Sequence, residues 1–103
     1  MATTKAYIEF VCEQIHGGYS VRYKKMFGEY MVYINEKPIF LVCDNTVFVK
    51  ELKEISSLME NSNRGIPYVG AKEHYILDIE NVELTAKVVK ILEEITPLPK
   101  KKK

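Results

Sequence analysis

The residues most able to carry chemistry are two cysteines, Cys12 and Cys43, and two histidines, His16 and His74. Cys12 and His16 stand at i and i+4, so on a helix they would share one face, where an imidazole can activate a thiol as a nucleophile. Cys12 also belongs to an apolar helical stripe, and this spacing favours burial as a small hydrophobic residue. Zinc needs four nitrogen or sulfur ligands at recognisable spacing, which this chain does not offer. We therefore predict no catalytic residue, no metal ligand and no cofactor, and two reduced, buried thiols.

Two loop segments are weaker candidates for a site. Glu29 is a candidate general base, although a single carboxylate without an acid partner is more typical of a solvated charge. The segment from Tyr68 to Lys72 contains a glycine and an ammonium group that could bind an anion, although its composition favours a tight turn. Both segments interrupt strands, so we predict that the sheet brings them together. The candidate interaction surface comprises Met26, Phe27, Gly28, Glu29, Tyr30, Tyr68, Gly70, Ala71 and Lys72.

A basic cluster gives the alternative function. Arg22, Lys24 and Lys25 lie among tyrosines and are candidate contacts to nucleic acid, although so few bases would bind weakly and with a steep loss of affinity in salt. Without the four lysines 100–103, eleven basic residues face fourteen acidic ones, so the body of the chain has a net charge of minus three. The overall charge of +1 thus comes from the tail, and weak or indirect binding of nucleic acid is the second hypothesis.

The elements that must position these residues follow from the hydrophobic period. An apolar stripe at i, i+3, i+4 and i+7 predicts a helix over residues 4–16, capped by Thr3 or Thr4 and stopped by Gly17 and Gly18. Alternation with a period of two, and short β-branched or aromatic runs, predict strands that begin at residue 20 and cover 30–34, 39–43, 46–49 and 75–79. Turns are predicted at NEKP (35–38) and DN (44–45), and a loop over residues 61–67. Further helices are predicted over residues 51–60 and 82–95, the second of them capped by Asn81 and ended by Thr96 and Pro97.

This order predicts an α+β fold, with an antiparallel meander of about five strands and three helices packed on one face. Met26 and Phe27 are both apolar and break the alternation, so we expect Gly28 to form a bulge or bend in the sheet. The strands 30–34 and 39–43 are apolar on both faces, and three helices cover only one face. The second face is therefore expected to carry tyrosines or to meet a partner, including a second copy of the chain.

Two motifs resemble a known family. The segments "YKKMFGEYMVYINEKPIFLVCDNTVFVK" and "IPYVGAKEHYILDIENVE" resemble the N-terminal domain of the TfoX (Sxy) family over nearly the whole chain. Met26, Phe27, Gly28 and Tyr30 match the first motif of that family, and the second motif is matched by Pro67, Tyr68, Gly70, Ala71 and Lys72. The resemblance implies a non-enzymatic regulator, a transcriptional co-regulator linked to DNA-uptake competence that acts with a protein partner such as a transcription factor. The full-length regulators have two domains, so this chain resembles their N-terminal domain standing alone.

Length and composition indicate one domain, residues 1–99, followed by a disordered basic tail at 100–103. No apolar run reaches the roughly 18 residues that a membrane span needs, and the N-terminus does not resemble a secretion signal. We therefore expect a soluble, cytoplasmic protein that does not bind membranes.

Overall fold

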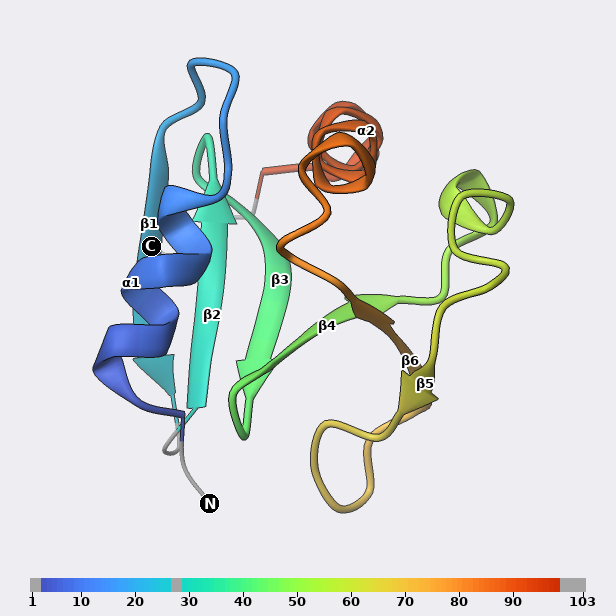
Figure 1. Cartoon of the computed structure of the whole chain (residues 1–103), viewed down its shortest axis with the longest axis horizontal. Helices are drawn as coiled ribbons and strands as arrows, with labels where there is room; N and C mark the ends of the chain where they lie inside the picture. The colour runs from blue at the N-terminus through green and yellow to red at the C-terminus, as the bar shows by residue number, and fades with distance from the viewer. Residues whose placement is uncertain (1–2, 27–28, 99–103) are drawn as a thin grey trace.

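The computed structural model describes residues 3–26 and 29–98 as an α+β fold with two α-helices, a short 3₁₀ helix and six strands (Figure 1). The helical elements are α1 (Lys5–Glu13), η1 (Lys53–Ile55) and α2 (Val82–Ile95). The strands are β1 (Val21–Met26), β2 (Glu29–Ile34), β3 (Lys37–Cys43), β4 (Thr46–Lys50), β5 (Arg64–Gly65) and β6 (His74–Leu77). They form one antiparallel sheet in the order β1-β2-β3-β4-β6-β5.

Both α-helices begin at caps that their sequences indicate, whereas α1 ends earlier than predicted. The Thr4 hydroxyl accepts a hydrogen bond from the Tyr7 amide at 3.1 Å and caps α1, which ends at Glu13, three residues before the predicted end. The side chain of Asn81 caps α2 in the same way through the Leu84 amide, also at 3.1 Å. The helix α2 therefore has the bounds that were predicted for it, residues 82–95.

The prediction of a third helix, over residues 51–60, is wrong. Only Lys53–Ile55 forms a 3₁₀ turn, and the residues after it continue as turns. The Ile55 and Ser56 amides donate to carbonyls three residues earlier, the pattern of 3₁₀ structure rather than of an α-helix. Ile55 and Met59 are nevertheless fully buried, so their apolar spacing reports burial rather than helical geometry.

The predicted number of strands is also wrong, because the sheet has a sixth strand within the segment 61–67 that was assigned to a loop. The strand β5 is only two residues long and pairs with β6, with Arg64 opposite Tyr75 and Gly65 opposite His74. Two residues show no alternation, so only the pairing with β6 defines this edge strand.

The hairpins of the meander close with two-residue turns. Ile34 pairs with Lys37 across the β2–β3 turn, and Cys43 pairs with Thr46 across the β3–β4 turn. All four turn residues have positive φ, as type I′ turns require: Asn35, Glu36, Asp44 and Asn45. The turns that the sequence predicts at NEKP and DN are confirmed.

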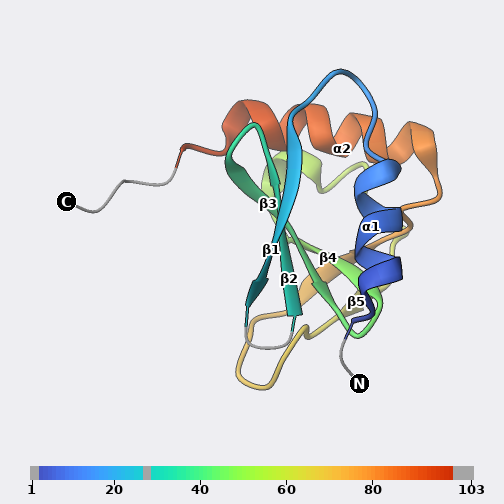
Figure 2. The same ribbon diagram turned by 90° about the vertical axis from the view of Figure 1, so that its left-hand side faces the viewer.

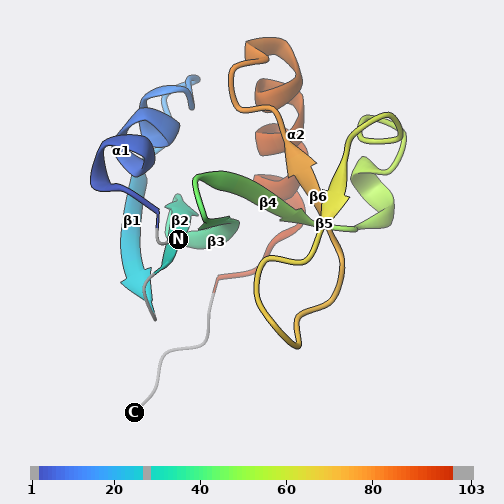
Figure 3. The ribbon, with the colours of Figure 1, turned by 60° about the horizontal axis from the view of Figure 1, so that its bottom comes forward.

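The sheet changes direction between its two halves. In Figure 1, β4 runs across the direction of β1 and β2, and Figure 3 shows β4 linking the first three strands to β5 and β6. The bend predicted at Gly28 lies outside the described residues; on either side of it, Met26 and Glu29 pair directly across β1 and β2. Among the described residues, the sheet thus changes direction at β3 and β4.

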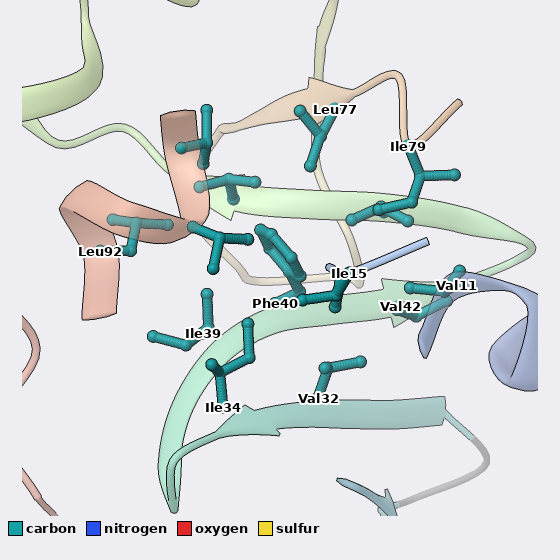
Figure 4. Packing of buried hydrophobic residues seen from close by; sticks show 14 of the residues in the cluster. Val11, Ile15, Val32, Ile34, Ile39, Phe40, Val42, Leu77, Ile79 and Leu92 are labelled. Carbon is teal, nitrogen blue, oxygen red and sulfur yellow. The ribbon is translucent and has the colours of Figure 1, made fainter. Parts of the chain in front are cut away.

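One face of the sheet carries the core. Opposite residues in antiparallel strands share a face, and the register places Tyr30, Val42, Val47 and Leu77 in one row. All four are buried, and they join one cluster with Ile8 and Val11 of α1 and Val88 and Leu92 of α2. Both helices therefore cover this face, which we call the inner face (Figure 2). Figure 4 shows Phe40, Val42 and Leu92 within this cluster.

Candidate functional site

The opposite face of the sheet, the outer face, also carries apolar side chains. The register aligns Lys24, Met31, Leu41, Phe48 and Ile76 in a row across five strands. Phe48 is buried, whereas Met31 and Leu41 in the middle of the row stay partly exposed. The outer face thus has an apolar centre that no described helix covers.

A hollow of about 400 Å³ opens at this centre. It is lined by Met26, Glu29, Met31, Leu41, Cys43 and Tyr68, and we call it the Met31 hollow. Two methionines and a leucine make a deformable apolar wall, of the kind that accommodates apolar groups from a partner. Among the described residues of this lining, Glu29 carries a charge, Tyr68 contributes a phenol and the others are apolar, so the hollow suits an apolar group better than a polar substrate.

A longer groove of about 1330 Å³ shares Met31, Leu41 and Tyr68 with the hollow. From there it extends to the C-terminal end of α2, where Leu98 is 62% exposed. Glu51, Glu54 and Glu73 line it together with Lys50 and Lys72. The pKa of Glu51 is raised by desolvation and by the neighbouring carboxyl group of Glu73. The groove therefore combines an apolar floor with a charged rim.

The loop 66–73 forms one side of both depressions. The Ala71 amide donates to the Tyr68 carbonyl at 3.0 Å, and Gly70 has a φ of +91°, as expected for the third residue of a type II turn. The exposed fraction is 59% for Tyr68 and 101% for Val69. A tight turn therefore projects two apolar side chains into solvent.

The other end of the hollow is held by Glu29. Its carboxylate accepts hydrogen bonds from the Thr3 hydroxyl at 3.0 Å and the Asp44 amide at 3.2 Å. The Asn45 amide in turn donates to the Thr3 hydroxyl at 3.2 Å. Glu29 thus ties β2 to the β3–β4 turn and to the residues that precede α1, an anchoring role rather than that of a general base.

The structure brings part of the predicted surface together. Met26 and Glu29 line the hollow with Tyr68, and Ala71 and Lys72 line the adjoining groove. Tyr30 does not take part, because alternation along β2 turns it to the inner face, where its ring lies edge-to-face on that of Tyr23 at 5.3 Å. Gly70 shapes the turn, and Phe27 and Gly28 lie outside the described residues.

Three residues of the hollow were missed by sequence reasoning: Met31, Leu41 and Cys43. The strands 30–34 and 39–43 are apolar at nearly every position, and that pattern already indicated a second apolar face. Assigning these residues to it required the register of β2 and β3, which the pattern alone does not provide.

The predicted basic cluster is divided by the same alternation. Arg22 and Lys24 align with the outer-face residues Tyr33 and Met31, whereas Lys25 aligns with Tyr30 on the inner face. The Arg22 guanidinium lies 4.5 Å from the centroid of the Tyr33 ring and makes a 2.8 Å ion pair with Glu36. The hydrogen bond from the Arg22 side chain lowers the pKa of the Glu36 carboxyl group. Arg22 already has an acidic partner, so the cluster is weaker for phosphate than its composition suggested.

The thiols are poorly activated. Burial raises the pKa of both Cys12 and Cys43 to about 11, with nearby acids adding to the effect, so both are thiols at neutral pH. Cys43 is buried and both cysteines are free, as expected, but Cys12 is only partly buried. His16 does not activate Cys12 in this arrangement, since its Nε2 atom lies 2.9 Å from the Glu13 carbonyl oxygen at the end of α1.

Within residues 3–26 and 29–98, no group of three or more His, Cys, Asp or Glu side chains is arranged to hold a metal ion. Neither helix in this part of the chain has the length and apolar character that crossing a bilayer requires.

Comparison with known proteins identifies a relative along the whole chain. The chain is 33% identical, over 105 aligned positions, to the "uncharacterized 12.7 kDa protein in trpE 5′ region" of Spirochaeta aurantia. The alignment covers 100% of this chain and 91% of the relative. No family model matches the chain, so the resemblance to the TfoX family stays a prediction. No solved structure matches it either.

Proposed function

The chain belongs to the same family as the 12.7 kDa protein of Spirochaeta aurantia, and we propose that it is a non-enzymatic protein-interaction module. Its binding surface in this proposal is the outer face of the sheet. The alignment runs the length of the chain, so the proposal concerns the whole domain rather than one segment.

The observation that carries this proposal is the partly exposed apolar centre of the outer face. Met31 and Leu41 stand in the middle of a sheet, where apolar side chains are normally covered. The adjoining loop adds Ile66, 61% exposed, and the fully exposed Val69. Apolar surface that is concentrated at one place and rimmed by charges is typical of a protein-binding site.

The resemblance to the TfoX N-terminal domain supports a more specific role. It suggests that the module acts in transcriptional co-regulation linked to DNA-uptake competence, together with a protein partner and in the cytoplasm. In that role the module would not contact DNA as its main ligand. The ion pair of Arg22 with Glu36 and the opposite directions of Lys24 and Lys25 support this ranking over direct binding of nucleic acid.

Site-specific photo-crosslinking in the native cell tests the proposal. A benzophenone amino acid placed at Tyr68 should give discrete protein adducts, because this side chain borders both depressions. The matched control is Val82 at the start of α2, which is 45% exposed and lines neither depression. Adducts of the same pattern from both positions, or none from position 68, would contradict the proposal.

A further inference from the structure

We propose that the outer face binds a second copy of this chain, and that the Tyr68–Val69 turn of each copy inserts into the Met31 hollow of the other. This inference rests on the proposed function and names its partner.

The turn provides the projecting half of such an interface. Val69 is 101% exposed, and Ile66 and Tyr68 beside it are more than half exposed. The bond from the Ala71 amide to the Tyr68 carbonyl fixes the turn, and the contact of His74 Nδ1 with the Lys72 carbonyl, at 2.8 Å, fixes the chain that leaves it. A preorganised projection loses little conformational entropy on binding, which favours insertion into a partner.

The Met31 hollow provides the receiving half. Its volume of about 400 Å³ leaves room for the tip of the turn rather than for a single side chain, and its lining of Met26, Met31 and Leu41 suits apolar groups such as Val69. Tyr68 belongs to both halves, since it lines the hollow and also starts the exposed turn. The projecting and receiving elements are therefore neighbours on one surface.

That adjacency favours a two-fold dimer. In an isologous interface each contact occurs twice, so a patch that contains both a projection and its complementary hollow can satisfy both at once. A two-fold axis near Tyr68 would bury both Val69 side chains and cover both Met31 side chains. A different protein would have to supply both complementary shapes itself.

The charges beside the turn and in the hollow also favour a second copy of the chain as the partner. The turn is followed by the exposed Lys72, and Glu29 lines the hollow. Insertion of the turn would bring Lys72 of one copy toward Glu29 of the other, an opposite-charge pair that favours this arrangement. Glu51, Glu54 and Glu73 line the adjoining groove and would be repelled by an anionic membrane surface, which makes a lipid bilayer a poorer occupant.

Sedimentation velocity on the purified full chain tests the inference. We expect the wild-type chain to form a dimer by about 100 micromolar, within the range of weak specific association. Val69→Asp and Met31→Glu should each weaken the dimer by roughly tenfold or more, since each puts a carboxylate at the buried centre of the interface. Val82→Asp is the matched control and should associate as the wild type does.

Both variants should leave the fold intact. Val69 is fully exposed, and residue 31 faces Lys24 on the neighbouring strand, where a glutamate gains an opposite charge. Thermal unfolding of each variant checks this, and a monomer counts as support only for a variant that unfolds cooperatively.

Mixing the two variants makes the test specific to a second copy. The Val69→Asp chain keeps an intact hollow, and the Met31→Glu chain keeps an intact turn, so a mixed dimer retains one of the two contacts. The mixture should therefore associate more tightly than either variant alone and more weakly than the wild type. A mixture no tighter than its components would overturn the inserted-turn arrangement.

A wild-type chain that stays monomeric at all concentrations would overturn the inference outright. If crosslinks from position 68 then still lead to another protein, the interaction module stands and only its partner differs. If those crosslinks are absent as well, the proposed function fails too.

Discussion

The two faces of this sheet both carry apolar side chains at their centres but have very different surroundings. On the inner face, the row of Tyr30, Val42 and Val47 is buried beneath α1 and α2. On the outer face, the neighbouring row contains Met31, which follows Tyr30 in β2, and Leu41, which precedes Val42 in β3, and both stay partly exposed. Apolar character therefore does not by itself tell which face is the core. The inner face stabilises the fold, whereas the outer face is available for binding.

The largest effect should come from adjacent residues of β3 on opposite faces. Phe40→Ala removes a fully buried ring and should lower the free energy of unfolding by about 3–5 kcal/mol, because a cavity remains in the core. Leu41→Ala, on the outer face, should cost only about 1 kcal/mol, since its side chain is already partly hydrated. Urea unfolding of both variants measures the difference. Equal losses would mean that the outer face is a second core.

A smaller effect is expected where the outer face is tied to the N-terminus of α1. Thr3→Val keeps the shape of this buried side chain but removes the hydroxyl that donates to Glu29 and accepts from the Asn45 amide. The free energy of unfolding should fall by about 1–3 kcal/mol, because partly buried polar groups lose their partner. Thr46→Val is the control, because the Thr46 hydroxyl donates to the nearby Asp44 carbonyl at an exposed site. Similar losses for both threonines would show that Thr3 has no special anchoring role.

The smallest effect concerns the hydrogen bonds that join Asn35 and Lys37, at the β2–β3 turn, to Glu93 of α2; we call them the clamp. The Glu93 carboxylate accepts hydrogen bonds from the side chains of Asn35 and Lys37, at 3.3 and 3.2 Å, and these lower its pKa below the usual 4.5. A lowered folded-state pKa contributes stability that is complete above the unfolded-state pKa and is lost as the pH falls through the folded-state value. Glu93→Gln should therefore reduce the melting temperature slightly at neutral pH and make its decline on acidification shallower.

Thermal unfolding from neutral pH to about pH 3 measures this change. The matched control is Glu94→Gln, at the exposed neighbouring position, which should keep the acid-dependent decline of the wild type. If the melting temperature of the Glu93→Gln variant falls with pH as steeply as that of the wild type, the clamp does not contribute to stability through the charge of Glu93.

The sequence predicted the locally encoded parts of the fold. Asn81 and the Thr96–Pro97 pair predicted both ends of α2, and the turn residues predicted two hairpins whose positive φ values the structure confirms. The helix predicted at 51–60 failed because Ile55 and Met59 are buried through turns, and the same apolar spacing suits either structure. The strand β5 was missed because two residues carry no period.

The candidate surface could be predicted only in part, because local sequence patterns do not show which strands pair. Tyr68 lies with Met26 and Glu29 in the lining of the Met31 hollow. Tyr30 lies on the inner face instead, and alternation already indicates this, since Tyr30 and Glu29 are adjacent in one strand. Met31 and Leu41 needed the pairing of β2 with β3 before they could be placed together.

By itself, the amino-acid sequence determined how α1 and α2 are capped, how the hairpins turn, and that two faces of the sheet would be apolar, because capping, turn geometry and side-chain alternation depend on neighbouring residues. Only the tertiary structure decided which face α1 and α2 cover and which loop borders the other. That choice depends on packing between residues far apart in the chain, and no local pattern encodes it.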